Sequence, residues 1–242
     1  MPDKTLKQRI RDGEVVRSLG VPMDIERGRL EDLLAQGSYD YLAVDAQHGP
    51  LDEVQLVAFC ATAQDLELPV QCRIKHTRHT YLIGNYLDLG PAGIMVPEVE
   101  DEAVVNEAVR AFYYPQVGGR SWGGTARMGL NERPDRLEYA AWWNGYGTLA
   151  IQIESVNSVI KAGTLARTGV DIFAFGPNDL MFSIEAHPAF PFRTVDECIK
   201  HVLDQIKDKQ VKVALGVGAE TPETQEHYAE MGGTIFGNRV GI

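Results

Sequence analysis

Three segments of the sequence end an apolar run in side chains that can move protons or bind cations. Asp45 and His48 follow the first run, Glu154 follows the second, and Asp179 follows the third through a Gly-Pro turn. Burying such groups is costly unless they are paired or bind something. Because these residues lie far apart in the sequence, the fold must bring the three strand ends together if they form one site.

The carboxylates Glu154 and Asp179 are the candidates for binding a metal ion. Two carboxylates that converge without a base between them repel each other until a cation neutralises them. Oxygen ligands with further positions open to water and substrate suit Mg²⁺ or Mn²⁺. The alternative is that each carboxylate caps the helix that follows it, a role that contributes about 1 kcal/mol. The spacing alone favours neither interpretation.

Asp45 and His48 bracket a tight turn and could share a hydrogen bond. Such a bond would fix the imidazole tautomer and raise its basicity. The pair could then exchange a proton with a water molecule acidified by a metal ion. The alternative is a structural turn in which Asp45 caps a helix beginning near Leu51 and His48 is merely exposed, which is the simpler interpretation of these two residues alone.

Arg73 ends another apolar run, and a guanidinium at that place needs an anion. Arginine binds a carboxylate through two parallel hydrogen bonds, so a substrate carboxylate is one candidate partner. An ion pair with Asp45 or Glu98 is the other, and both remain open.

Two glycine-containing turns could present backbone N–H groups to an anion. They are the stretch from Gly176 through Pro177 and Asn178 to Asp179, and the stretch 123–126, which contains Thr125 and Ala126. Backbone N–H groups at turns and helix starts can hold a carboxylate or an enolate oxygen. The sequence contains no dinucleotide-binding GxGxxG, no P-loop, no HExxH and no nucleophile elbow.

Short apolar runs rich in β-branched residues alternate with segments of helical spacing along the whole chain. The runs mostly lack the alternation of a half-exposed strand, so they predict strands buried on both faces. Regular alternation of this kind predicts a parallel α/β fold. The predicted strands lie at 15–16, 39–44, 69–74, 92–96, 149–153, 170–175, 211–215 and 234–236, and the predicted helices at 24–36, 52–64, 81–89, 101–112, 133–143, 155–167, 194–209 and 222–231.

Eight such units in 242 residues predict a single (β/α)8 TIM barrel domain over residues 1–242, with a doubly wound open sheet as the alternative. The barrel accounts for the polar strand ends, because its active site forms at the carboxyl ends of the strands. The connection 113–131 is too long for an ordinary turn, which suggests a function. Since the sequence stops at Ile242, we expect no outer helix after the eighth strand, and we expect residues 6–11, a loop or another subunit to cover that side.

Composition restricts the partners and the compartment. The chain has 23 Lys and Arg against 34 Asp and Glu, a net charge of −11, which opposes binding to nucleic acid or to an anionic membrane. The three cysteines are widely spaced and indicate neither a disulfide framework nor a cysteine-rich zinc site. With no apolar signal-peptide core and no apolar run approaching 18 residues, we expect a cytoplasmic protein.

Taken together, the motifs resemble those of the class II, metal-dependent pyruvate aldolases. These belong to the HpcH/HpaI aldolase/citrate lyase family, which includes the 4-hydroxy-2-oxoheptanedioate aldolases. The resemblance covers nearly the whole chain, and its last two motifs are the most specific. The motifs are Tyr39-Asp40-Tyr41, Asp45-Ala46-Gln47-His48-Gly49, Arg73, Leu87-Asp88-Leu89-Gly90, Met95-Val96-Pro97, Tyr114-Pro115, Gly119-Arg120, Gln152-Ile153-Glu154 and Gly176-Pro177-Asn178-Asp179-Leu180.

The resemblance implies a role for each catalytic position. A divalent cation, Mg²⁺, Mn²⁺ or Co²⁺, would be held by Glu154 and Asp179 and would chelate the 2-oxo acid. Arg73 would stabilise the enolate, and His48, oriented by Asp45, would move the proton that accompanies cleavage or formation of the carbon–carbon bond.

The resemblance also implies the substrate-binding positions. Gln152 would hold the substrate or its water, and backbone groups would line the pyruvate pocket. Gln47 belongs to this set, but members of the family typically carry Glu there. The amide removes one negative charge and leaves the pH behaviour, the metal affinity and the reaction open. The expected pocket residues are Gly176, Pro177, Asn178, Gly124, Thr125 and Ala126.

The implied activity is that of a lyase that reversibly cleaves a 4-hydroxy-2-oxo acid to pyruvate and an aldehyde. Two alternatives stay open: related enolate chemistry, such as oxaloacetate decarboxylation or condensation with another electrophile, and a barrel that binds an oxo acid without turnover. Family members are usually hexamers built from dimers that exchange their last helices. We therefore expect a homo-oligomer, with its arrangement left open by the missing helix.

Overall fold

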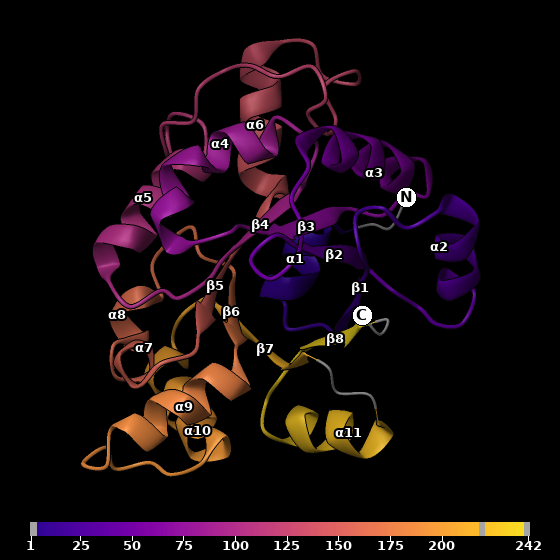
Figure 1. Cartoon of the computed structure of the whole chain (residues 1–242). Coiled ribbons are helices and arrows are strands. Elements are labelled where there is room, and N and C mark those ends of the chain that lie inside the picture. The colour runs from indigo at the N-terminus through magenta and orange to yellow at the C-terminus, as the bar shows by residue number, and fades with distance from the viewer. Residues whose placement is uncertain (1–3, 218–220, 240–242) are drawn as a thin grey trace.

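The computed structural model describes residues 4–217 and 221–239 and shows eight parallel strands closed into a barrel (Figure 1). Each strand pairs with the next one in the sequence, and β8 pairs with β1. The predicted (β/α)8 fold is confirmed, and the alternative of an open sheet is wrong. The strands are β1 (Val16–Gly20), β2 (Tyr41–Asp45), β3 (Val70–Arg73), β4 (Gly93–Val96), β5 (Thr148–Ile153), β6 (Ile172–Phe175), β7 (Lys212–Val217) and β8 (Ile235–Arg239).

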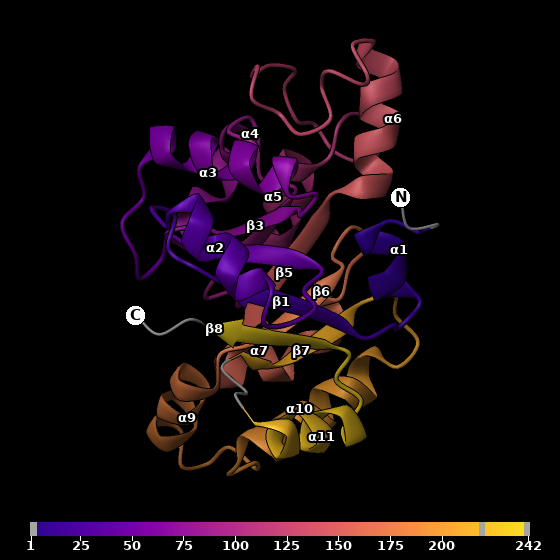
Figure 2. The ribbon, with the colours of Figure 1, turned by 90° about the vertical axis from the view of Figure 1, so that its right-hand side faces the viewer.

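The helices surround the barrel and connect consecutive strands (Figures 1 and 2). One of them, α9, is not among the predicted helical ranges, although the cap interpretation of Asp179 implied a helix after it. Pro177 occupies the first turn of this helix, where its missing N–H costs nothing. The helices are α1 (Leu6–Arg11), α2 (Arg27–Leu34), α3 (Glu53–Asp65), the 3-10 helix η1 (Thr77–Leu82), α4 (Ile83–Leu87), α5 (Glu102–Phe112), α6 (Arg136–Tyr146), α7 (Val156–Ile160), α8 (Ala162–Leu165), α9 (Pro177–Ala186), α10 (Val195–Ile206) and α11 (Pro222–Glu230).

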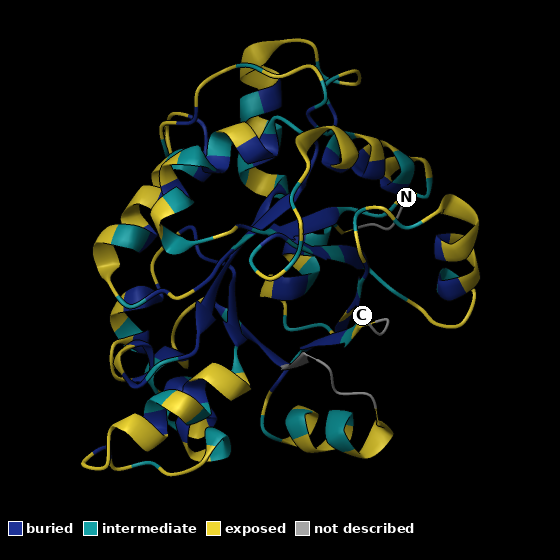
Figure 3. Cartoon of the chain, in the orientation of Figure 1, coloured by how far each residue is buried: buried dark blue, intermediate teal, exposed yellow. Residues whose placement is uncertain are grey.

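The strands are buried on both faces, as their unbroken apolar runs predict (Figure 3). All six residues of β5 are buried. The outward side chains of the strands pack against the helices in one large apolar cluster. The inward side chains fill the lower part of the barrel with a second, smaller cluster: Val16, Tyr41, Ala150, Ile172, Ala174, Ala214 and Ile235. The barrel is therefore filled by side chains and is not a pore.

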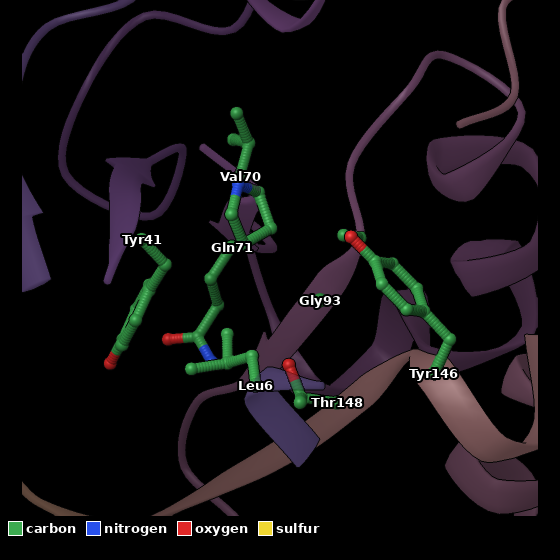
Figure 4. A pocket seen from close by; sticks show the side chains of 9 residues that line it. Leu6, Tyr41, Val70, Gln71, Gly93, Tyr146 and Thr148 are labelled. Atoms are coloured by element: carbon green, nitrogen blue, oxygen red, sulfur yellow. The ribbon is translucent and has the colours of Figure 1, made fainter. Parts of the chain in front are cut away.

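Helix α1 closes the amino-terminal end of the barrel. Thr5 caps it through a reciprocal pair of hydrogen bonds with Gln8, and Leu6 and Ile10 pack against the inner cluster. Figure 4 shows Leu6 beside Gln71 and Thr148, where these residues line a small cavity. Of the three alternatives for covering the outer side near the eighth strand, residues 6–11 are therefore not the one observed. The expectation about a helix after that strand concerns residues 240–242, which lie outside the described residues.

A buried ionic network fixes α1 to the barrel. The Lys7 Nζ donates to the Tyr113 hydroxyl at 2.7 Å and lies 3.2 Å from an oxygen of Asp171. Arg11 donates to the other Asp171 oxygen at 3.0 Å. Burial lowers the pKa of Lys7, although the nearby Asp171 carboxylate opposes this shift. Asp171 immediately precedes β6, so the network joins α1 to the start of that strand.

The long connection 113–131 lies at the amino-terminal side of the barrel, because it follows α5 and leads to α6 and β5. Figure 2 shows α6 at the same end as α1, opposite to the tip of β8. Cation–π contacts hold the connection in place: the Arg127 guanidinium lies 3.9 Å from the Trp122 ring and 4.8 Å from the Tyr139 ring. Of the helices in the described part of the chain, none combines the length and apolarity needed to cross a membrane.

Candidate active site

Charged and polar side chains meet at the carboxyl ends of the strands, where the barrel interior changes from apolar to polar. The register pairs Asp45 at the end of β2 with Arg73 at the end of β3. Gln152 near the end of β5 and Arg239 at the end of β8 reach the same region. The predicted convergence of the polar strand ends is found in the structure.

Asp45 holds Arg73 through two hydrogen bonds. The Arg73 Nε donates to Oδ1 of Asp45 at 2.7 Å, and its Nη2 donates to Oδ2. Burial acts to raise the pKa of Asp45, but the hydrogen bonds and charge of Arg73 outweigh it, so that the pKa is lowered. Of the two protein carboxylates considered as partners of Arg73, Asp45 is the one observed.

The expected orientation of the His48 imidazole by Asp45 is not observed. The Asp45 Oδ1 accepts instead from the backbone N–H groups of Gln47, at 3.0 Å, and of His48, at 3.4 Å. The alternative role of Asp45 as a helix cap is wrong as well, because Asp52 caps α3. His48 is exposed, and its ring makes no hydrogen bond with any described residue.

Gln152 links Arg73 to Glu154. Its side-chain carbonyl accepts from Nη1 of Arg73 at 3.2 Å, and its amide donates to Oε2 of Glu154 at 2.9 Å. Because the amide bonds on both sides, its orientation is fixed. A continuous row of hydrogen bonds therefore runs from Asp45 to Glu154.

Glu154 is a buried carboxylate that receives hydrogen bonds but no cation from the described residues. Its exposed fraction is 7%. Burial raises its pKa to about 7, a hydrogen bond from the backbone N–H of Glu98 at 2.6 Å acts in the opposite direction, and the charge of Asp179 raises the pKa further. Arg73 lowers it only partly. The charged form of Glu154 is thus poorly compensated.

Asp179 lies in the first turn of α9, with Gly176 as the residue before the helix. No side chain caps this helix, so the alternative role of Asp179 as a cap is not observed. The first N–H groups of the helix therefore have no capping side chain. The N–H groups of Asn178 and Asp179 are thus free of helical partners. A Cβ at Gly176 would lie 2.4 Å from Oε2 of Glu154, so only glycine leaves room beside that carboxylate.

The donors at this place fit a hard divalent cation. Two carboxylates, one of them buried and raised in pKa by its own burial and by its neighbour, gain from a nearby positive charge. Across residues 4–217 and 221–239 there is no cluster of three or more His, Cys, Asp or Glu side chains suited to a metal ion. Glu154 does not cap the helix that follows it either, since Ser155 caps α7.

Thr125 and Ala126 are not brought to this site within one chain. A Cβ on Gly124 would lie 2.4 Å from the Cβ of Asp88, and one on Gly90 would lie 3.3 Å from the Ala126 carbonyl oxygen. Asp88 and Gly90 belong to the turn before β4, at the amino-terminal side of the barrel. The expectation that these two residues line the pocket of their own chain is therefore not met.

Gln47 makes contact with a residue that sequence analysis did not place in the site. Its amide donates to Oε1 of Glu98 at 3.3 Å, and Nε2 of His76 lies 3.3 Å from the other Glu98 oxygen. Glu98 has φ of 53°, an uncommon conformation for a residue other than glycine, which aims its N–H at Glu154. A carboxylate two positions after the fourth predicted strand is the signal that could have found it.

Arg239 is the second residue that sequence analysis missed. Its Nη2 donates to Oδ2 of Asp45 at 3.0 Å. The prediction ended the eighth strand at residue 236, three residues before the arginine. A charged residue in the same phase as the inward-facing Ile235 would have indicated it.

The arrangement supports chemistry on a small anion that carries further oxygen atoms. Arg73, held by Asp45 and Gln152, presents a fixed positive charge near Glu154, which also has Asp179 as a charged neighbour. Such preorganised charge stabilises negative charge that develops on a substrate oxygen.

Comparison with known proteins finds aldolases among the relatives. The chain is 31% identical over 210 residues to a hydroxypyruvate/pyruvate aldolase of Delftia acidovorans, covering 83% of this chain and 74% of the relative. It is 28% identical over 212 residues to a 2-dehydro-3,6-dideoxy-6-sulfogluconate aldolase of Pseudomonas putida, covering 83% and 77% of the two chains. In fold it is similar to the crystal structure of an HpcH/HpaI aldolase from Desulfitobacterium hafniense, with a TM-score of 0.82, 22% identity, and coverage of 98% and 90%.

The sequence profile of one family matches residues 29–238, which include every residue of the hydrogen-bonded row from Asp45 to Glu154 and also Asp179. A match of this extent establishes membership. The chain belongs to the HpcH/HpaI aldolase/citrate lyase family and is a carbon–carbon lyase.

Proposed function

We propose that this protein is a divalent-metal-dependent aldolase that reversibly cleaves a 4-hydroxy-2-oxo acid to pyruvate and an aldehyde. The observation that carries the proposal is the poorly compensated carboxylate of Glu154, joined through Gln152 to Arg73. The names of the relatives, which are aldolases acting on hydroxypyruvate or pyruvate and on a sulfogluconate derivative, support the same reaction class.

Glu154 and Asp179 would hold the cation, for which Mg²⁺, Mn²⁺ and Co²⁺ are the candidates. When bound, it would supply positive charge to the carboxylate and keto oxygens of the oxo acid. The free N–H groups of Asn178 and Asp179 at the start of α9, beside Gly176 and Pro177, would bind the substrate carboxylate.

Arg73 would stabilise the charge that develops during cleavage. The C4 hydroxyl loses its proton, the C3–C4 bond breaks, and the aldehyde carbonyl forms at C4. The electron pair of the broken bond moves toward C3 and the keto oxygen, and C3 then gains a proton to become the pyruvate methyl group. Because Asp45 and Gln152 fix the guanidinium before substrate binds, little reorganisation is needed.

His48 would exchange the proton of the C4 hydroxyl. It lies three residues after Asp45 on the loop that leaves β2, and its exposed ring has no described partner that would compete for its nitrogens. Gln47, which is anchored to Glu98, would hold the substrate or its water.

The test is release of pyruvate from a set of 4-hydroxy-2-oxo acids, before and after removal of metal by a chelator and readdition of Mg²⁺, Mn²⁺ or Co²⁺. Wild-type protein should depend on metal, and Asp179→Asn should lose that activity. Glu185→Gln, on the exposed surface of the same helix, is the matched control and should behave as wild type. Absence of turnover with every acid and metal, or decarboxylation of oxaloacetate without aldol cleavage, would refute the proposal.

We also propose a homo-oligomer located in the cytoplasm. The three cysteines are free and buried, which suits a reducing compartment. Light scattering of the purified protein should give a mass that is a multiple of 26.7 kDa. A single 26.7 kDa species would contradict the oligomer.

A further inference from the structure

The hydrogen-bonded row from Asp45 to Glu154 closes into a ring through Gln47 and Glu98. The backbone N–H of Gln47 donates to Oδ1 of Asp45, and its side-chain amide donates to Oε1 of Glu98. The backbone N–H of Glu98 donates in turn to Oε1 of Glu154. Hydrogen bonds thus join the ends of four neighbouring strands, β2 to β5. The members of the ring are Asp45, Arg73, Gln152, Glu154, Glu98 and Gln47.

One acceptor of this ring has no partner. The Oε1 of Gln47 is buried and makes no hydrogen bond with any described residue. Leaving a buried polar atom unpaired destabilises the folded protein, so such an atom indicates a missing partner. An amide oxygen accepts and never donates, so the missing partner is a donor. In the proposed function the available donors are O–H groups, either of water or of the hydroxy acid.

Glu98 decides which end of the Gln47 amide is left available. A carboxylate only accepts, so it takes the NH₂ end of the amide and leaves the carbonyl end for another partner. Glu98 meets Glu154 through its backbone and Gln47 through its side chain. It makes both contacts at a φ of 53°, a conformation that is costly for a residue other than glycine and is typical of functional sites.

His76 lies against the other oxygen of Glu98. Its Nδ1 accepts from the backbone N–H of Arg78 at 2.9 Å, at the start of η1. A neutral imidazole that accepts at Nδ1 carries its proton on Nε2. That Nε2 lies 3.3 Å from Oε2 of Glu98. Each oxygen of Glu98 therefore lies next to an N–H group, one from His76 and one from Gln47.

We propose that Glu98 and His76 are positioning residues that hold the Gln47 amide with its carbonyl oxygen free to accept from an O–H group in the active site. The identity of that O–H group rests on the proposed function. The orientation of the amide follows from the hydrogen bonds of the ring. A Gln47 amide turned the other way would present two donors where an acceptor is needed.

Two substitutions reverse and then restore this orientation. In Glu98→Gln the new amide has one accepting and one donating end, and the Nε2–H of His76 favours the accepting end. The donating end then faces Gln47, whose own carbonyl must turn to accept. Adding His76→Asn removes the nitrogen beside position 98, so the accepting end can return to Gln47. Asparagine is also a good cap for η1, so the loop keeps its support.

The first test observes the amide by NMR in metal-free protein. Labelling glutamine side chains with ¹⁵N gives an NH₂ signal for Gln47, which is assigned by its loss in Gln47→Met. Glu98→Gln should move this signal, and the added His76→Asn should return it toward its wild-type position. Glu102→Gln, an exposed carboxylate of α5, is the matched control and should leave it in place. A signal that Glu98→Gln does not move, or that the second substitution does not bring back, would overturn the proposal.

Kinetics measure what the orientation contributes. For cleavage of 4-hydroxy-2-oxopentanoate with Mg²⁺, Glu98→Gln should lower kcat/KM about 10- to 100-fold, the loss expected when a donor replaces a needed acceptor. His76→Asn alone should lower it about threefold, because Glu98 still accepts but is held less firmly. The double variant should be about fivefold more active than Glu98→Gln. If Glu98 acted only through its charge, the two losses would multiply, and the double variant would be the least active.

Exchange of the pyruvate methyl protons with D₂O identifies the O–H donor. Pyruvate has no hydroxyl group. Slower exchange in Glu98→Gln, restored in the double variant, would therefore identify water as the donor to Gln47. An unchanged exchange rate together with impaired and restored cleavage would identify the hydroxyl of the acid. Either pattern supports the positioning role.

The positioning role and the proposed function can fail separately. If wild type cleaves no 4-hydroxy-2-oxo acid while the NMR signal of Gln47 moves and returns as expected, the proposed function fails and the positioning of Gln47 stands. If wild type is an aldolase but the signal does not respond to Glu98→Gln, the positioning role fails and the aldolase stands.

Discussion

Among the described residues, each end of the barrel contains one buried carboxylate, and the two have opposite surroundings. At the amino-terminal end, Asp171 is fully buried and accepts from the cations Lys7 and Arg11, from the Tyr113 hydroxyl and from the backbone N–H of Leu149. At the carboxyl end, Glu154 is 7% exposed and receives only an amide and a backbone N–H. No described cation pairs directly with it.

The difference separates stability from function. A buried carboxylate surrounded by cations and donors is a structural element, and removing one partner leaves an uncompensated charge. A buried carboxylate without a cation destabilises the folded protein, and such groups are typical of a site that binds a ligand. In barrels of this class the carboxyl end carries catalysis and the amino end carries stability, and the two carboxylates follow this division.

Removing Lys7 should cause the largest loss of stability. Lys7→Met leaves Asp171 and the Tyr113 hydroxyl without their buried donor, and breaking a buried pair in this way costs about 3–5 kcal/mol. Urea unfolding followed by fluorescence measures the free energy of unfolding. The kcat of the molecules that remain folded should equal that of wild type. A fall in kcat of tenfold or more would show that the amino end also serves catalysis.

Replacing Glu154 should have the opposite pattern. Glu154→Gln keeps the shape but removes a proposed metal ligand, so kcat/KM should fall about 10²- to 10³-fold, as for loss of one electrostatic stabiliser. Without metal and at pH 8, the variant should be at least as stable as wild type, because the amide avoids burying a charge. A large loss of stability instead would place Glu154 among the structural carboxylates.

The pH dependence of stability should reveal the same carboxylate. Burial raises the folded pKa of Glu154 from 4.5 to about 7, so its contribution is fully present below pH 4.5 and is lost as the pH rises toward 7. By linkage the metal-free protein should lose about 3 kcal/mol from this group over that interval. Glu154→Gln should remove this component of a urea-unfolding series measured in chelator. Saturating Mg²⁺ should remove this pH dependence in wild type. If the pH dependence persists in the variant, a group other than Glu154 causes it.

Asp45→Asn should have a smaller effect that is confined to the carboxyl end. The amide can keep one acceptor for Arg73 but loses the charge that holds both guanidinium groups. We expect kcat/KM to fall about tenfold, the loss expected for one charge-assisted hydrogen bond of modest strength. Retro-aldol kinetics measure it, with Asp52→Asn, which retains a good helix cap, as the control. An unchanged kcat/KM would show that Arg73 is positioned without Asp45.

The smallest effect is expected at an exposed ion pair. Arg27 lies between Glu31 and Asp65 on the outer surface, with 51% of its side chain exposed. Surface pairs are screened by water and salt. Arg27→Gln should leave the urea midpoint and kcat/KM unchanged within error. A shift comparable with that of Lys7→Met would remove the distinction between buried and exposed charges.

Much of the architecture and part of the site follow from the sequence alone. Apolar runs and helical spacing are local periodicities, so they predicted all eight strands and the barrel. The same logic predicted that Glu154 and Asp179 follow strand ends, and that Asp45 and Arg73 end neighbouring strands. These predictions succeeded because parallel strands present their carboxyl ends at one face.

The pairing of the side chains was decided only by the tertiary structure. Asp45 lies three residues from His48, yet its carboxylate binds Arg73 and Arg239, because strand register and the absence of a side chain at Gly20 bring the two guanidinium groups closer than the imidazole. Likewise, the loop that contains Thr125 follows a helix and not a strand, so it lies at the amino-terminal side. Sequence periodicity determines which face a residue takes, whereas partners distant in sequence are selected by packing and closure of the barrel.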